Sequence, residues 1–206
     1  MSRFITFEGT EGTGKTTQIQ LLKEYLEVKK VPTIVTREPG GTKTGERIRE
    51  ILLDKDLKQL DADTELLLMF AARAQHLEEV IYPALKNSIV VLCDRFTDAS
   101  YAYQGGGRNI PIEKIAKLEQ VVQGDFRPDL TILLSCDLSV GMQRVESRGV
   151  KDRFEKEQVE FFQRVEQTYL HRANEQPERF VIVNADQTIN EIAEEIQRVV
   201  NARLAL

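Results

Sequence analysis

The stretch that decides the fold is Gly9-Thr10-Glu11-Gly12-Thr13-Gly14-Lys15-Thr16-Thr17. It follows the apolar run Phe4–Glu8 and leads into a helical pattern at Gln18–Lys29. A G-x-x-x-x-G-K-S/T pattern between a strand and a helix is typical of a phosphate-binding loop, the P-loop. Its glycines let the backbone come close to a phosphate, and backbone N–H groups at the start of the helix face the anion. Lys15 can reach the β- and γ-phosphates and Thr16 can coordinate Mg²⁺, so the stretch predicts binding of a nucleoside triphosphate.

The composition indicates one globular domain over residues 1–206. At 206 residues and 41% hydrophobic, the chain can bury a sizeable core. A net charge of −5 and a pI near 5.3 argue against a protein that coats nucleic acid. No apolar run reaches the ~18 residues of a membrane span, and no signal-peptide core precedes Phe4. We therefore expect a soluble, cytoplasmic protein with no nucleic-acid or membrane partner.

Strand-like and helix-like segments alternate along the chain. Five runs are expected as strands: Phe4–Glu8, Thr33–Thr36, Ile89–Cys93, Leu130–Cys136 and Phe180–Asn184. Helical patterns fall at Gln18–Lys29, Thr44–Leu53, Thr64–Lys86, Thr97–Gln104, Ile112–Gln123, Ser139–Arg148 and Glu155–Gln176, and a last one carries Ile189 to Val200. The alternation predicts an α/β protein with the three-layer P-loop NTPase fold. We expect a five-stranded parallel sheet with helices on both faces and a small lid at about residues 141–155.

The cysteines and histidines carry little functional signal. Cys93 and Cys136 each end an apolar run, where a small buried thiol fits well, and a redox-active pair is the alternative interpretation. His76 and His171 have no Cys or His neighbour at ligand spacing, so we expect no structural metal.

Polar groups recur where the predicted strands end. Besides the P-loop, these groups are Arg37–Gly41, Asp94-Arg95, Asp137 and the turn Asn184–Gln187. Ligands of open α/β sheets bind outside the carboxyl ends of the strands, so we interpret these groups as one site. Asp94 suits an acidic group that holds Mg²⁺ beside Thr16. Arg95 indicates a second bound anion, although a strand-end salt bridge between the two residues is the simpler alternative.

Two positions on the helical pattern Thr64–Lys86 suggest recognition of a base. Phe70 and Arg73 are three residues apart and therefore share one helix face. An arginine on an apolar face is costly unless something pairs with it. An aromatic ring with an arginine can hold a base by stacking and hydrogen bonding. A core phenylalanine beside an arginine that binds protein carbonyls is the alternative.

Three arginines surround an interruption at Gly149. Arg144, Arg148 and Arg153 could close over the transferring phosphates, neutralise their charge and exclude water. An ordinary solvated face is the alternative, since acidic residues also populate this stretch. The glycines Gly105–Gly107 are expected to end the preceding helix, or else to bring backbone close to a substrate.

Taken together, these motifs resemble the thymidylate kinase family of P-loop nucleoside monophosphate kinases, in its bacterial form. The similar stretches are FEGTEGTGKTT at 7–17, TREPGGT at 36–42, FAARAQH at 70–76, CDRFTDASYAYQG at 93–105 and NADQ at 184–187. The P-loop alone is shared with many unrelated proteins, whereas the combination is far more specific. The resemblance implies transfer of the ATP γ-phosphoryl group to dTMP with Mg²⁺, giving dTDP and ADP for dTTP synthesis. It also suggests a homodimer.

The resemblance assigns roles to individual positions. ATP is expected to contact the loop Gly9–Thr17 and Ala185. The residues expected to bind dTMP are Glu11, Arg37, Glu38, Pro39, Phe70, Arg73, Arg95, Ser100, Tyr103 and Gln104. The expected catalytic residues are Lys15, Arg95, Arg144, Arg148 and Arg153, and the expected metal site is formed by Thr16, Asp94 and Glu11. The bond between Glu38 and Pro39 is a candidate cis peptide bond.

One departure from some relatives bears on the mechanism. Those proteins have an arginine in the P-loop where this chain has Gly12, so we expect the lid arginines to supply the charge. On this basis Arg153→Ala should lower kcat more than dTMP binding. Two other functions stay open at this point. One is phosphorylation of a different monophosphate or a small metabolite, and the other is a GTP-hydrolysing switch, although the chain lacks the guanine-reading Asn-Lys-x-Asp motif.

Overall fold

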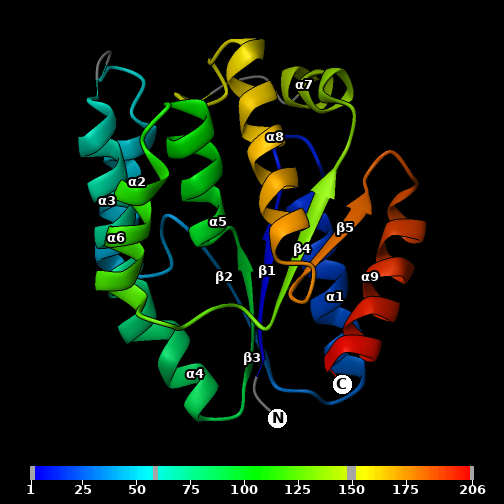
Figure 1. The fold of residues 1–206 in the computed structure, drawn as a ribbon. Helices are drawn as coiled ribbons and strands as arrows, with labels where there is room; N and C mark the ends of the chain where they lie inside the picture. The colour runs from blue at the N-terminus through cyan, green and yellow to red at the C-terminus, as the bar shows by residue number, and fades with distance from the viewer. Residues whose placement is uncertain (1–2, 58–59, 148–151, 205–206) are drawn as a thin grey trace.

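Parallel strands form one sheet at the centre of the protein (Figure 1). The structure is a computed structural model that describes residues 3–57, 60–147 and 152–204. Within these ranges the strands are β1 (Phe4–Glu8), β2 (Thr33–Arg37), β3 (Val90–Asp94), β4 (Leu130–Ser135) and β5 (Phe180–Asn184). Their order across the sheet is β2-β3-β1-β4-β5. The expected parallel α/β fold is confirmed, and each strand boundary lies within one residue of its prediction.

The central strands are almost completely buried, which explains their continuous apolar sequences. All five residues of β1 are buried, as are the first four of β3. The edge strands β2 and β5 are partly exposed. Parallel strands covered by helices on both faces have no polar face to present, so apolar residues run without alternation.

Helices cover both faces of the sheet (Figure 1). On one face α1 (Lys15–Val28) and α9 (Ile189–Leu204) pack together against alternate sheet residues. The opposite face carries α3 (Ala62–His76), α4 (Tyr82–Lys86), α5 (Thr97–Ser100) and α8 (Val159–Glu175). The other helices are α2 (Lys43–Leu53) and α6 (Ile112–Gln123), which flank α3, and α7 (Leu138–Ser147) at the carboxyl end of the sheet. No helix within the described residues is long and apolar enough to cross a membrane.

The single helix expected over Thr64–Lys86 is wrong in detail. Helix α3 begins at Ala62, where the Asp61 side chain accepts hydrogen bonds from two backbone N–H groups. A π-helical turn, η1 (Leu77–Ile81), then separates α3 from α4. Pro83 follows this turn and has no N–H to donate to the preceding turn, and a wider turn accommodates that loss.

The expectation for the three glycines is also corrected. The helix of α5 continues as a second π-helical segment, η2 (Tyr101–Gly107), so the glycines lie inside it. A Cβ atom on Gly106 would lie 2.7 Å from the Arg164 carbonyl oxygen of α8, and one on Gly107 would lie 2.4 Å from the Phe161 ring. Arg164 also donates to the carbonyls of Gly106 and Gly107, at 3.0 and 2.9 Å. The glycines therefore allow two helical segments to pack closely.

Cys93 and Cys136 are buried free thiols, as we expected from their positions at the ends of apolar runs. Burial raises the pKa of the Cys93 thiol well above its usual value, and nearby carboxylates add to this effect. The redox alternative gains no support from a protonated, buried thiol.

Candidate active site

The P-loop connects β1 to α1 at the carboxyl edge of the sheet. Helix α1 begins at Lys15, one residue after Gly14, whose φ of 87° is readily adopted only by glycine. The Lys15 Nζ atom donates to the carbonyls of Gly9 and Thr10, at 3.0 and 2.7 Å. Burial, with the positive charge of Arg95, lowers the pKa of Lys15 to about 8. The loop therefore holds an ammonium group that remains protonated at neutral pH.

A cavity opens in front of this loop. Its lining consists of Glu11, Gly12, Gly14, Lys15, Thr16, Thr17, Arg49, Asp94, Arg95, Arg144, Asp152 and Glu155. We call this space the phosphate cavity. The side chain of Arg144 lines this cavity and donates to the carbonyls of Gly12 and Ala185, both at 3.3 Å. Of the three predicted lid arginines, Arg144 thus lies at the P-loop.

Thr16 and Asp94 form an oxygen-rich corner of the phosphate cavity. The Thr16 hydroxyl lies 3.5 Å from Asp94 Oδ2, and the buried Asp94 Oδ1 accepts no hydrogen bond from any described residue. No group of three His, Cys, Asp or Glu side chains within the described ranges could hold a metal on its own. Mg²⁺ is usually bound by one or two carboxylates together with phosphates and water, so Thr16 and Asp94 fit this ion.

Arg95 lies between the P-loop and a second cavity. Its Nη2 atom lies 2.8 Å from Glu11 Oε1 and 3.1 Å from the Tyr103 hydroxyl, which in turn donates to Glu11 Oε2 at 2.6 Å. The Glu11 carboxylate, which was also expected to bind the metal, is therefore engaged by Arg95 and Tyr103. The φ angle of Arg95 is +66°, a left-handed conformation that is uncommon outside glycine.

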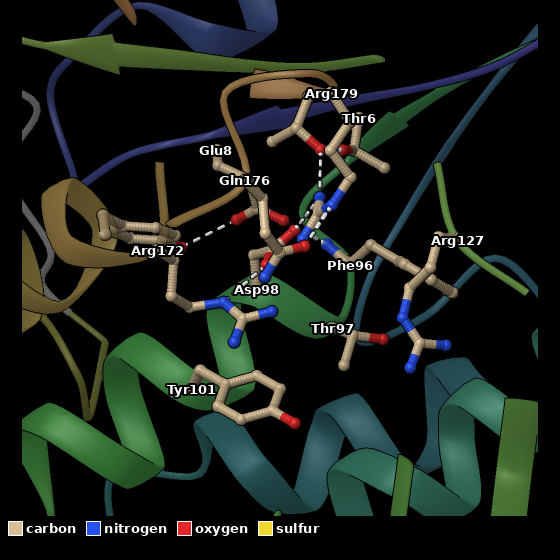
Figure 2. Close-up of polar contacts among 12 residues, drawn as sticks. Thr6, Glu8, Phe96, Thr97, Asp98, Tyr101, Arg127, Arg172, Gln176 and Arg179 are labelled. Carbon is tan, nitrogen blue, oxygen red and sulfur yellow. Dashed lines mark hydrogen bonds and ion pairs between the residues drawn. The ribbon is translucent and has the colours of Figure 1, made fainter. Parts of the chain in front are cut away.

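A buried polar network begins at Phe96, the residue after Arg95, and includes Glu8 and Asp98 (Figure 2). Glu8 accepts hydrogen bonds from the Phe96 backbone N–H and the Tyr169 hydroxyl, both at 2.7 Å. Burial, with the nearby charge of Asp98, raises the pKa of Glu8 to about 8. Asp98 in turn is held by Arg172 and Arg179 at 2.6 to 2.8 Å (Figure 2). This network was not predicted, because its members are far apart in the sequence.

The second cavity, which we call the base cavity, lies between α3, η2 and the loop after β2. Its lining consists of Glu11, Glu38, Pro39, Arg49, Leu53, Met69, Arg73, Arg95, Phe96, Ala99, Ser100, Tyr103, Gln104, Asp152 and Phe154. Glu11, Arg49, Arg95 and Asp152 line both cavities. The Glu38–Pro39 peptide bond is cis, as expected.

The buried Arg73 guanidinium forms an ion pair with Glu38, which compensates for the loss of water around its charge. The side chain is 2% exposed, and its Nε atom donates to Glu38 Oε2 at 2.7 Å. Its Nη2 atom donates to the Phe96 carbonyl and the Ser100 hydroxyl, at 3.2 and 3.1 Å. The Nη1 atom is buried and has no hydrogen-bond partner among the described residues. Because Arg73 lines the base cavity, its Nη1 group is available to a ligand there.

Phe70 lies next to Arg73 on α3. The ring is 2% exposed and lies below the Arg73 guanidinium at 4.6 Å, outside the lining of the base cavity. Met69 lines the cavity instead. Residues 69 and 73 are four apart on α3, a spacing that places both side chains on one helix face. The Phe70 ring packs in a core cluster, and its expected contact with a base stays a prediction.

Two other predicted arginines lie away from the phosphate cavity. Arg153 Nη2 lies 2.7 Å from the buried carboxylate of Glu65, and its Nε atom donates to the Leu52 carbonyl at 2.8 Å. Arg37 is paired with Glu46 at 2.8 Å, its side chain is 51% exposed, and it lines neither cavity. Neither side chain lines the phosphate cavity in this structure, and the expected roles of both residues at a phosphate stay predictions. Arg148 lies outside the described residues.

Arg49 was not predicted from the sequence to be a site residue. It lines both cavities and donates to the Pro39 carbonyl at 2.9 Å. Burial, with the charges of Arg37 and Arg95, lowers its pKa. The available signal was its helical spacing, because Arg49 lies four residues after Gly45 and three before Leu52, which are both buried in α2.

These features define the class of the protein. A P-loop in one cavity, joined through Arg95 to a second cavity with an unpaired buried donor, is the arrangement of a P-loop kinase with separate donor and acceptor sites. The family model described as thymidylate kinase matches residues 7–196. The chain therefore belongs to the thymidylate kinase family, whose members phosphorylate dTMP to dTDP.

Individual relatives agree with this family assignment. The chain is 54% identical over 193 residues to a thymidylate kinase of Ectopseudomonas mendocina (strain ymp), a match that covers 94% of this chain and 92% of the relative. It is 51% identical over 195 residues to a thymidylate kinase of Ruthia magnifica subsp. Calyptogena magnifica, with 95% of each chain covered. The crystal structure of thymidylate kinase from Ehrlichia chaffeensis is similar with a TM-score of 0.80, 35% identity, and coverage of 97% of this chain and 98% of that one. The resemblance seen in the sequence and the expected P-loop NTPase fold are confirmed.

Proposed function

We propose that this chain transfers the γ-phosphoryl group of ATP to the phosphate of dTMP in an in-line displacement. The observation that carries the proposal is that Arg95 lines both cavities. A positive group at this junction can hold the acceptor phosphate next to the donor phosphates. Positioning of this kind, rather than covalent chemistry, is the main contribution of enzymes that transfer phosphoryl groups.

Positive side chains from three elements surround the phosphate cavity. Lys15 reaches the β- and γ-phosphates, Arg144 binds oxygens next to Gly12, and Arg49 assists Arg95 with the acceptor. Together they stabilise negative charge on the transferring group, in a cavity that the bound nucleotides close to water. Mg²⁺, held by Thr16 and Asp94, would add to this stabilisation when bound.

The base cavity selects the acceptor. The free Nη1 donor of Arg73 faces a carbonyl oxygen of thymine, and Met69 packs against the ring as a soft apolar surface. Glu38 and Ser100 orient the Arg73 guanidinium rather than contact the base. Glu11 and Tyr103 border the sugar and acceptor phosphate.

Three finer points belong to the same proposal. We infer that the enzyme works in the cytoplasm, that residues 1–206 act as a single domain, and that it forms a homodimer through α3. Leu67 on α3 is 55% exposed and is a position at which the proposed contact can be tested. Light scattering should give twice the chain mass, and Leu67→Glu should shift the protein towards the mass of one chain. A wild-type mass of one chain at micromolar concentration would contradict the dimer.

The reaction itself is tested by its products. The enzyme should convert ATP and dTMP into equal amounts of ADP and dTDP, and it should release little phosphate when dTMP is left out. A switch protein would instead hydrolyse GTP without phosphorylating any monophosphate. That outcome would overturn the proposed function.

A further inference from the structure

We propose that Glu65 is a specificity-determining positioning residue that fixes which way the Gln104 amide faces. This inference rests on the proposed function and explains how the base cavity distinguishes thymine from cytosine. Glu65 lies in the first turns of α3 and is fully buried. Gln104 lies in η2, lines the base cavity and is 1% exposed. Neither residue lines the phosphate cavity.

The contact between the two residues has only one chemically reasonable direction. The Gln104 Nε2 atom donates to Glu65 Oε1 at 2.8 Å. An ionised carboxylate accepts hydrogen bonds and cannot donate one, so it can face only the NH₂ side of an amide. Among the described residues the Gln104 side chain forms this one hydrogen bond, through its nitrogen, so no protein donor there engages its oxygen. That oxygen is the group that Gln104 offers to a ligand.

Two arginines pair with the buried Glu65 carboxylate. Arg153 Nη2 lies 2.7 Å and Arg108 Nη2 lies 3.3 Å from Glu65 Oε2. The two contacts at Oε2 are not aligned as hydrogen bonds, whereas Oε1 accepts from Gln104 at 2.8 Å and from Arg108 Nε at 3.4 Å. A buried charge is tolerated only when it is paired. Arg153, which was expected at the transferring phosphate, thus supports the base cavity in this arrangement.

The polarity of Gln104 complements that of Arg73 on the wall of the same cavity. Arg73 supplies a free donor, and Gln104 supplies a free acceptor. The edge of thymine carries a carbonyl oxygen next to an N–H group and matches this pair. Cytosine presents an amino donor next to a ring-nitrogen acceptor, which is the reverse pattern. Because a mismatched base leaves buried polar groups unpaired, this arrangement should reject cytosine strongly.

Substitution of Glu65 by glutamine tests the inference. The Glu65→Gln side chain can both donate and accept, so it no longer fixes the Gln104 amide. We expect the ratio of kcat/KM for dTMP to that for dCMP to fall by at least about tenfold. The dTMP to dUMP ratio should stay within about twofold, since these bases share the same edge. Glu119→Gln is the matched control, because Glu119 is a buried carboxylate that accepts from Tyr101 away from both cavities.

A second substitution separates positioning from general destabilisation. Gln104→Met should lower the dTMP to dCMP ratio by itself, and adding Glu65→Gln should then change the ratio no further. If Glu65→Gln does not fold, Glu65→Asp keeps the charge but withdraws it from Gln104, and its ratio should fall as well. An unchanged ratio in a folded Glu65 variant would overturn the inference. Failure of the wild-type enzyme to phosphorylate either dTMP or dUMP would instead overturn the proposed function.

Discussion

The two cavities of this enzyme are built in different ways. The phosphate cavity depends on one continuous loop, Gly9–Thr17, whose own backbone carbonyls anchor Lys15. In the base cavity, Arg73 and Gln104 are each oriented by a buried acid from a distant part of the chain. Glu38 holds Arg73 across 35 residues of sequence, and Glu65 holds Gln104 across 39.

The difference separates affinity for phosphate from choice of base. Charges and backbone N–H groups stabilise any nucleotide phosphate, so they carry little information about the base. Donors and acceptors that buried carboxylates hold fixed can reject a base with the opposite pattern. Substitutions at the phosphate cavity should therefore lower kcat, whereas substitutions at the base cavity should raise KM or change the preferred acceptor.

The largest expected effect is on the phosphate side. Lys15→Met should lower kcat by about 10³-fold, because it removes a charge that stabilises the transferring phosphoryl group. The dissociation constant for dTMP, measured by calorimetry, should stay within about twofold, since Lys15 lies outside the base cavity. Comparable losses in dTMP affinity and kcat would show that the two cavities are not separable.

The arginines at the two cavities should behave differently. Arg144→Ala should lower kcat by about 10²-fold, because Arg144 lines the phosphate cavity. Arg153→Ala should act mainly on KM for dTMP, since its partner is Glu65. Steady-state kinetics measure both, with Arg47→Ala as an exposed control. A kcat loss for Arg153→Ala as large as that for Arg144→Ala would restore the role that the sequence suggested for Arg153.

On the base side, neighbouring residues of α3 should differ. Met69→Ala should raise KM for dTMP by up to about tenfold, through loss of sulfur and apolar contact with the base. Phe70→Leu should change this KM less and reduce thermal stability, because the ring packs in the core below Arg73. The reverse order of effects on KM would place Phe70 against the base after all.

The smallest effect on activity concerns Glu8, whose contribution should appear in stability. Its pKa of about 8 lies above the ordinary value of 4.5, so the folded state binds more protons than the unfolded state between these values. The stability that Glu8 contributes is therefore complete below about pH 4.5 and is lost as pH rises through about 8.

The unfolding free energy of the wild-type protein should fall between pH 5 and pH 8, and in Glu8→Gln this fall should be smaller by on the order of 2 kcal/mol. Urea titrations at both pH values measure the difference, and kcat should change only a few-fold because glutamine still accepts from the Phe96 N–H. An unaltered pH slope would mean that Glu8 is ionised in the folded protein.

Local patterns predicted most of the fold and the phosphate cavity. Strand ends, the P-loop and the pairing of Thr16 with Asp94 depend on short-range sequence and on the topology of parallel sheets. The π-helical turns η1 and η2 could not be predicted in this way. The apolar spacing that predicted one helix over Thr64–Lys86 takes no account of the missing N–H of Pro83, on which η1 depends. The segment η2 depends on the close contact between Gly106 and α8, which is a tertiary effect.

The base cavity was predicted less well because its contacts are long-range. Helical spacing brought Phe70 and Arg73 together, but only packing shows that Met69 faces the cavity. The ion pair of Arg153 with Glu65 joins segments 88 residues apart, and nothing local in either segment indicates it. The buried acids that orient the recognition groups are therefore visible only in the structure.

The most direct test of the account compares acceptors with the wild-type enzyme. The values of kcat/KM should decrease in the order dTMP, dUMP, dCMP. Loss of the methyl group should cost no more than about 200-fold, whereas the reversed edge of cytosine should cost at least about 10³-fold. A dCMP value equal to or above that for dUMP would contradict the claim that fixed donors and acceptors in the base cavity select the substrate.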